Sequence, residues 1–220
     1  MDAIGNAALT LAVGEHVILR EQVPADVDSY LHWFKHGEWR QWDAPWEDGI
    51  AATPEEEAKF RERFASMFEK EAPSPRRSAI IATRDGAPLM SMNRPRGDPP
   101  PGHRCAGSRR DPNGVPLGWV NRYNPKDDLE DWHVGIDICE DAYLNRGLGT
   151  EALRLWVDYL FENSDVHRIS LGTWSFNERM MRVAEKAGFT CEGRRRELRE
   201  WQDKWIDYIA YGVLRREWGL

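Results

Sequence analysis

The alternation of apolar and polar residues predicts strands and helices that follow one another along most of the chain. Short apolar or alternating runs predict strands over 16–21, 78–83, 131–139 and 167–172, and less regular runs suggest strands at 87–92 and 117–123. Apolar residues spaced three or four apart predict helices that begin near Asp26, Thr53, Gly147 and Ser175. Segments 190–200 and 205–214 predict a terminal antiparallel pair. The mixture predicts an α/β (α+β) fold.

Local signals mark several helix ends. Thr53 is a typical N-cap, because Pro54 and three glutamates follow it in the first turn. Ser175 and Glu178 have the spacing of a capping box, and Gly188 is placed to end the helix that follows.

One segment interrupts the pattern of strands. Residues 93–114 contain five Pro, four Gly and five Arg, and a loop of this length is unusual inside a compact domain. We interpret it as an insertion, either a passive surface loop or a basic arm that closes over a ligand. The sequence thus predicts a single domain over 15–218, with 1–14 as an N-terminal extension.

Composition narrows the class of partner. The 220-residue chain has a formal net charge of −7, which argues against a general nucleic-acid binder and suits a cationic substrate. Cys105, Cys139 and Cys191 are widely separated and odd in number, so neither a disulfide framework nor a metal site is expected. No signal peptide or membrane-spanning run is evident, and we expect a cytoplasmic protein without a membrane partner.

Tryptophans gather in one short segment. Trp33, Trp39, Trp42 and Trp46 lie within fourteen residues, where they either pack in the core or form an aromatic wall for a substrate. On the second interpretation, the candidate substrate-binding residues are Trp33, Trp42, Trp46 and Trp174.

Two glycines mark the junction between a predicted strand and a predicted helix. Gly147 and Gly149 allow a sharp turn and leave the N–H groups of the first helical turn uncovered. Such a helix start binds phosphate well, although a plain helix-entry turn has the same local pattern.

Two motifs carry a family resemblance. Arg146-Gly-Leu-Gly-Thr-Glu-Ala-Leu153 resembles the acetyl-CoA loop of the GNAT superfamily of N-acetyltransferases, and Asn177-Glu-Arg-Met-Met-Arg-Val-Ala-Glu-Lys-Ala-Gly-Phe189 resembles its second signature. With the closing segment 205–214, the chain looks like the branch of the ribosomal-protein alanine acetyltransferases. The resemblance covers 115–218 well and 15–92 more loosely, and it is absent over 93–114.

The resemblance implies a fold and a cofactor site. The family fold is a mixed, mostly antiparallel sheet of six or seven strands with helices on both faces. Two parallel strands, here 131–139 and 167–172, splay apart and admit acetyl-CoA. Carried over, the backbone N–H groups of Arg146, Gly147, Leu148, Gly149 and Thr150 would hold the pyrophosphate. The pantetheine arm would pair with Ile138 and Cys139, and Asn177 would bind the cofactor or a water. Leu144 stands where the family usually has Gln or Arg.

The catalytic residues are less well defined by the resemblance. Many relatives have a glutamate where this chain has His133, and Asp137 and Glu140 are further candidates for the base. His133 and Asp137 share a strand face but lie about 13 Å apart at the usual strand rise. Asp137 is also compatible with a structural role.

Several residues are candidates for the group that donates a proton to the departing thiolate. Ala184 and Met180 occupy positions where relatives carry a tyrosine or a serine, which leaves Asn177, a water, Tyr143 or Tyr208. Cys139 is compatible with a covalent acetyl-enzyme, but a packing role is simpler.

These features predict direct transfer of an acetyl group from acetyl-CoA to a primary amine. The acceptor is either a protein N-terminus or a small cationic amine such as an aminoglycoside or a polyamine. The alternative is a non-catalytic acyl-CoA sensor on the same fold. No nucleic-acid partner is expected, and a homodimer is a further possibility.

Overall fold

The computed structural model describes residues 8–43, 45–46, 53–84, 113–123 and 130–219. The 87–92 segment, and all of the predicted insertion except Asn113 and Gly114, lie outside the described residues.

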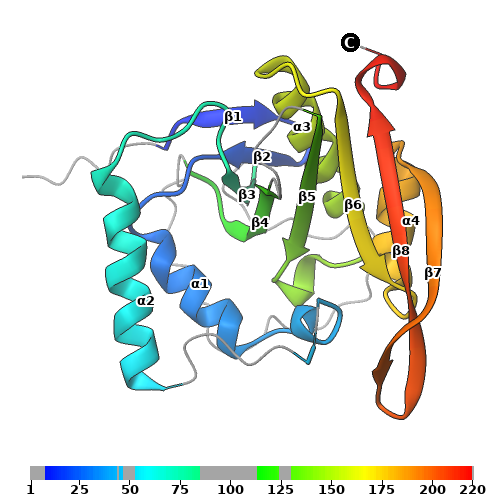
Figure 1. The fold of residues 1–220 in the computed structure, drawn as a ribbon. Helices are drawn as coiled ribbons and strands as arrows, with labels where there is room; N and C mark the ends of the chain where they lie inside the picture. The colour runs from blue at the N-terminus through cyan, green and yellow to red at the C-terminus, as the bar shows by residue number, and fades with distance from the viewer. Residues whose placement is uncertain (1–7, 44, 47–52, 85–112, 124–129, 220) are drawn as a thin grey trace, which may run out of the picture.

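One sheet of eight described strands organises the molecule (Figure 1). The strand order is β1-β2-β3-β4-β5-β6-β8-β7, and every neighbouring pair is antiparallel except β5 with β6. The strands span Thr10–Val13 (β1), Val17–Arg20 (β2), Ser78–Thr83 (β3), Pro116–Tyr123 (β4), Asp131–Ile138 (β5), Arg168–Trp174 (β6), Thr190–Trp201 (β7) and Lys204–Leu214 (β8).

The sheet has more described strands than the six or seven that the family resemblance implies. The extra strand is β1, which lies within the segment 1–14 and pairs with β2. Its four residues are all at least partly exposed, so no run of buried apolar side chains marks it in the sequence.

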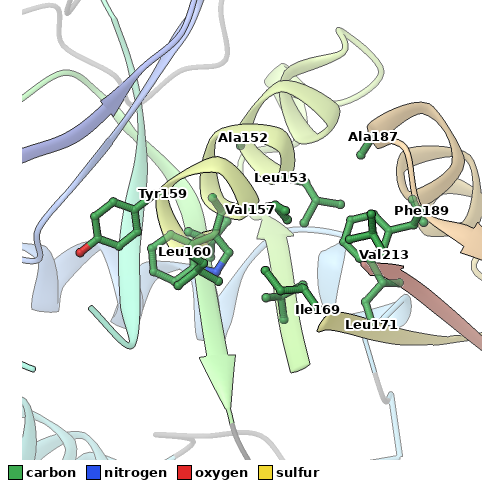
Figure 2. Packing of buried hydrophobic residues seen from close by; sticks show 14 of the residues in the cluster. Ala152, Leu153, Val157, Tyr159, Leu160, Ile169, Leu171, Ala187, Phe189 and Val213 are labelled. Carbon is green, nitrogen blue, oxygen red and sulfur yellow. The ribbon is translucent and has the colours of Figure 1, made fainter. Parts of the chain in front are cut away.

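Within the described residues, four α-helices cover the two faces of the sheet: Asp26–Lys35 (α1), Pro54–Ser66 (α2), Leu148–Glu162 (α3) and Glu178–Ala187 (α4). α3 and α4 pack over one face, where Leu153, Val157 and Leu160 of α3 meet Ile169 and Leu171 of β6 (Figure 2). α1 and α2 supply Tyr30, Phe34 and Phe64 to a second cluster with Ile80 of β3. The helices therefore lie on both faces, as predicted.

The capping residues of α2 and α4 can be compared with those predicted from the sequence. Thr53 is the predicted N-cap of α2 and also forms a capping box with Glu56, which was not predicted, and Gly188 ends α4 in the left-handed conformation at φ 110°. The N-cap of α4 is Asn177 rather than Ser175, because Asn177 Oδ1 accepts from Met180 N at 3.0 Å. Ser175 Oγ instead accepts from Asp207 N at 3.1 Å and ties the end of β6 to β8.

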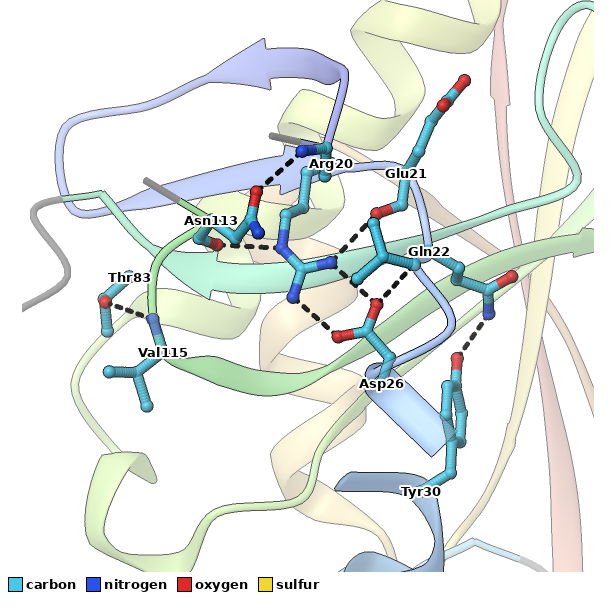
Figure 3. Close-up of polar contacts among 10 residues, drawn as sticks. Arg20, Glu21, Gln22, Asp26, Tyr30, Thr83, Asn113 and Val115 are labelled. Atoms are coloured by element: carbon cyan, nitrogen blue, oxygen red, sulfur yellow. Dashed lines mark hydrogen bonds and ion pairs between the residues drawn. The ribbon is translucent and has the colours of Figure 1, made fainter. Parts of the chain in front are cut away.

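A buried ion pair fixes the start of α1 against the sheet (Figure 3). Arg20 of β2 donates to both carboxylate oxygens of Asp26, each at 2.8 Å, and both side chains are almost fully buried. Arg20 Nε also donates to the carbonyl of Asn113, just before β4. Breaking such a pair by removing one partner costs about 3–5 kcal/mol, so this contact holds α1 and the segments around it in place.

Candidate active site

The site lies where β5 and β6 separate. These strands pair only over Asp131–His133 and Arg168–Ser170; beyond them β5 pairs with β4 alone and β6 with β8 alone. Figure 1 shows the two strands diverging from this point. A cavity of about 320 Å³ lies in the divergent part, lined by both strands, the starts of α3 and α4, and Trp39, Trp42 and Asp43. This is the splayed parallel pair that the sequence predicts.

One end of the cavity meets the start of α3. Gly147 is its N-cap in the left-handed conformation at φ 81°, and Leu148 is buried in the core. The first helical bond runs from Glu151 N to Gly147 O at 3.1 Å, so the N–H groups of Leu148, Gly149 and Thr150 precede the helical ladder. Gly149 itself lines the cavity. A helix start of this kind favours an anion through its N–H groups and its dipole.

Ile138 and Cys139 differ in what they offer to a ligand. Cys139 N donates to Leu117 O at 2.8 Å, and its side chain is buried in the second hydrophobic cluster. Because backbone groups alternate along a strand, Ile138, which lines the cavity, directs its N–H and C=O toward the gap. The expectation that Cys139 pairs with the cofactor is therefore corrected, whereas Ile138 keeps that geometry.

The other face of the cavity is built on two glycines at matching positions. Gly135 and Gly172 each lie two residues beyond the last paired residues, His133 and Ser170. A Cβ at Gly135 would lie 2.6 Å from Asn121 Oδ1, and one at Gly172 would lie 1.8 Å from the hydroxyl oxygen of Tyr208. The missing side chains make room for this amide and this hydroxyl over the gap. Glycine inside a strand often marks such a close approach.

Two carboxyl groups lie at the cavity. Burial raises the pKa of the Asp137 carboxyl well above its usual range, and the charge of Asp43 raises it further. Both residues line the cavity. A site with two carboxyl groups favours a cationic ligand.

His133 lies apart from these groups. Its Nε2 is 3.6 Å from Asp131 Oδ2, its ring packs against Tyr123 at 5.3 Å, and it is absent from the cavity lining. Of the three candidates for the base, His133, Asp137 and Glu140, only Asp137 lines the cavity.

The predicted aromatic wall is only partly present. Trp42 and Trp174 line the cavity, and Trp46 packs edge-on behind Trp174 at 4.9 Å. Trp33 does not reach it: its side chain is 1% exposed, and its Nε1 donates to Glu140 Oε1 at 2.8 Å. Trp33 is therefore a core residue, and Glu140 is its partner.

Asn177 joins the cavity to the tryptophan segment. Its Oδ1 caps α4, and its Nδ2 donates to the carbonyl of Trp42 at 3.0 Å. The side chain lines the cavity but already holds two parts of the protein together.

Sequence reasoning missed Asn121, Tyr123, Asp43 and Gly172 as lining residues. The positions of Asn121, Tyr123 and Gly172 depend on how the strands pair in the sheet, which no local sequence pattern shows. The glycines at 135 and 172, inside otherwise regular strands, are the signal that could have found this face.

The described residues also bear on metal binding and on membrane crossing. They contain no group of three or more His, Cys, Asp or Glu side chains arranged to hold a metal ion. None of their helices is long and apolar enough to cross a membrane.

Comparison with known families decides the classification. The model of the acetyltransferase (GNAT) domain matches residues 16–190, well over half of the chain. The chain belongs to the GNAT acetyltransferase family. Its fold agrees, since an acetyltransferase of this family from Bacillus anthracis superposes with a TM-score of 0.64 at 14% identity, covering 94% of this chain and 99% of that one.

Three curated relatives of this GNAT chain are named as N-acetyltransferases. "Probable N-acetyltransferase YjcK" of Bacillus subtilis (strain 168) is 40% identical over 77 residues, which cover 35% of this chain and 42% of that protein. "Putative ribosomal N-acetyltransferase YdaF" of the same organism is 27% identical, covering 48% and 57%. An aminoglycoside N(6')-acetyltransferase type 1 of Klebsiella pneumoniae is 32% identical, covering 37% and 45%. The matched part therefore spans about half the length of these relatives.

Proposed function

We propose that this chain is an acetyl-CoA-dependent N-acetyltransferase that acetylates a primary amine by direct transfer. The observation that carries the proposal is the short pairing of β5 with β6. It opens a cavity that has the start of α3 at one end and is also lined by two carboxyl groups, Asp137 of β5 and Asp43 of the segment after α1. An anionic cosubstrate and a cationic acceptor thus each have a complementary surface.

The cosubstrate end is supported by the geometry of α3. The N–H groups of Leu148, Gly149 and Thr150 would bind the pyrophosphate, with Gly147 and Arg146 at the turn before them. Ile138 would pair with the pantetheine arm across the open edge of β5. When bound, acetyl-CoA would supply the thioester whose acyl carbon the amine attacks, with CoA thiol as the leaving group.

The acceptor end requires a neutral amine. Removing the proton from a lysine-like amine costs about 4–5 kcal/mol at pH 7, and about 1–1.5 kcal/mol for an α-amine. Asp137 would accept this proton, and its raised pKa makes its carboxylate a stronger base than an ordinary one. Tyr208, with its hydroxyl over Gly172, would return a proton to the leaving sulfur.

Direct transfer is favoured over a covalent intermediate on Cys139. The thiol is buried among apolar side chains, and that burial, with Asp137 and Glu140 nearby, raises its pKa well above the usual range. A thiol held protonated is a poor nucleophile.

Release of thiol from acetyl-CoA tests the proposal. The panel of acceptors contains α-amino peptides, lysine peptides, aminoglycosides and polyamines. Amine-dependent release, with the acetylated amine formed in equal amount, is the expected result. Tight acetyl-CoA binding with no release across the panel would favour the acyl-CoA sensor instead. A cytoplasmic location and a homodimer stay predictions.

A further inference from the structure

Two buried polar atoms in the cavity between β5 and β6 lack hydrogen-bond partners among the described residues. They are Oδ1 of Asn121, on β4, and Nε1 of Trp42, in the segment that follows α1. Both side chains line the cavity. One atom is an acceptor without a donor, and the other is a donor without an acceptor.

The contrast with other indoles in the protein is informative. Nε1 of Trp33 donates to Glu140, that of Trp39 to the carbonyl of Trp33, and that of Trp156 to the carbonyl of Asn121. Leaving a buried polar group unsatisfied costs about 1–3 kcal/mol, and folded proteins keep few of them. Two such atoms in one cavity indicate a ligand that satisfies both.

Trp42 is held in position before any ligand arrives. The Trp42 carbonyl accepts from Asn177 at 3.0 Å, and the Arg179 guanidinium lies 4.9 Å from the centre of the Trp42 ring. Asn121 lies directly over Gly135, where a Cβ would collide with it. The absence of a side chain at Gly135 thus gives the Asn121 amide its place at the cavity.

We propose that the acceptor is a primary amine that carries an oxygen hydrogen-bond acceptor a few bonds from its nitrogen. Asn121 Oδ1 receives an N–H of the amine, and Trp42 Nε1 donates to the oxygen. An α-aminoacyl group at a peptide terminus has this chemistry, and so does an amino sugar; a polyamine lacks the oxygen. The inference rests on the proposed function, which it narrows to one class of amine.

Binding of matched amines to the CoA-saturated protein tests this without requiring turnover. Alaninamide and 3-methylbutan-2-amine have nearly the same shape, but only the first has an oxygen. At pH 6.5 both are largely protonated. Calorimetry should show that alaninamide binds about tenfold more tightly, as one added hydrogen bond of about 1.4 kcal/mol implies. Spermidine should bind no better than the hydrocarbon amine.

Variants assign the preference to the two atoms. Trp42→Phe removes Nε1 and should weaken alaninamide alone, which brings the ratio of the two dissociation constants near one. Trp218→Phe is the matched control, because its Nε1 donates to Asp158 away from the cavity, and the ratio should not change. Asn121→Leu should weaken both amines, whereas Asn121→Asp keeps the acceptor and should retain binding.

The outcomes separate this inference from the proposed function. Equal binding of the two amines by the wild-type protein, or a preference that survives Trp42→Phe, would overturn the inference even if acetylation occurs. Selective alaninamide binding without any turnover would support the subsite and count against the enzyme. Measuring 6-amino-6-deoxyglucose in the same way distinguishes an amino sugar from a peptide terminus as the preferred acceptor. If alaninamide and 6-amino-6-deoxyglucose both bind more weakly than 3-methylbutan-2-amine, the proposal is refuted.

Discussion

The hydroxyl of Tyr208 lies directly over Gly172. A Cβ built at this glycine would lie 1.8 Å from the hydroxyl oxygen and 2.3 Å from the ring carbon that carries it. Tyr208 comes from β8, so its ring reaches diagonally across β6 to the edge of the gap. The absence of a side chain at Gly172, which lines the cavity, therefore leaves room for the Tyr208 hydroxyl beside it.

Because Tyr208 occupies the space over Gly172, substitutions at these two positions should have non-additive effects on the free energy of unfolding. Gly172→Ala should destabilise the protein by about 1–3 kcal/mol, because the new methyl group meets a ring rather than a flexible chain end. Adding Tyr208→Ala should remove most of that penalty. Urea unfolding of the single and double variants measures the coupling. Strictly additive effects would show that the ring is free to move aside.

The same hydroxyl has a predicted role in catalysis. Tyr208→Phe keeps the ring but removes the proton donor, so kcat should fall by about 10²-fold, within the usual range for a general acid. The affinity for acetyl-CoA should not change. Steady-state kinetics and calorimetry measure the two quantities. An unchanged kcat would assign proton return to water.

The raised pKa of Asp137 should make the folded protein less stable as the pH rises. Its folded-state pKa is raised, chiefly by burial, so its contribution is fully present below the unfolded pKa of about 3.9 and is lost as pH rises through the folded value. Asp137→Asn should therefore raise Tm at pH 8, and the gain should shrink toward pH 5. Because Asp43 also raises this pKa, Asp43→Asn should move the loss to lower pH. A Tm difference that does not vary with pH would contradict the assignment.

Because Gly149 lies at the start of α3, a side chain at this position should lower the affinity for acetyl-CoA. A Cβ there would make ordinary contacts, 3.7 Å from Ile138 Cγ1 and 3.8 Å from Val183 Cγ2, so Gly149→Val should fold. Its branched side chain would project where the cofactor must pass, and acetyl-CoA affinity should fall by about tenfold or more. Gly193→Val is the control, since that glycine lies in β7 with nothing within 4 Å of its added Cβ. Equal affinities in both variants would place the cofactor elsewhere.

Much of the fold is predictable because its signals are local. The N-cap at Thr53 and the glycine at 188 mark helix ends in the sequence alone, and the structure confirms both. The alternation over 131–139 gives β5 within one residue. β1 escaped prediction because its residues are all partly exposed and carry no buried pattern.

The site is less predictable because it depends on pairing across the sheet. Trp33 and Trp42 look alike in the sequence, yet helical packing buries the first and only the second reaches the cavity. Asn121 has no local motif, and its role follows from lying opposite Gly135 on the neighbouring strand. His133 shares a strand face with Asp137, but the strands are still paired at His133 and open only beyond it.

The most direct test compares three proteins in one assay: the wild type, Asp137→Asn and His133→Gln, each with acetyl-CoA and α-amino or lysine-like acceptors. We predict amine-dependent thiol release by the wild type, and a fall in kcat/KM of about 10²-fold for Asp137→Asn that is larger for the lysine-like amine. His133→Gln should lose much less. A greater loss in His133→Gln than in Asp137→Asn, or no thiol release by the wild type, would contradict an acetyl transfer that relies on Asp137 at the opening between β5 and β6.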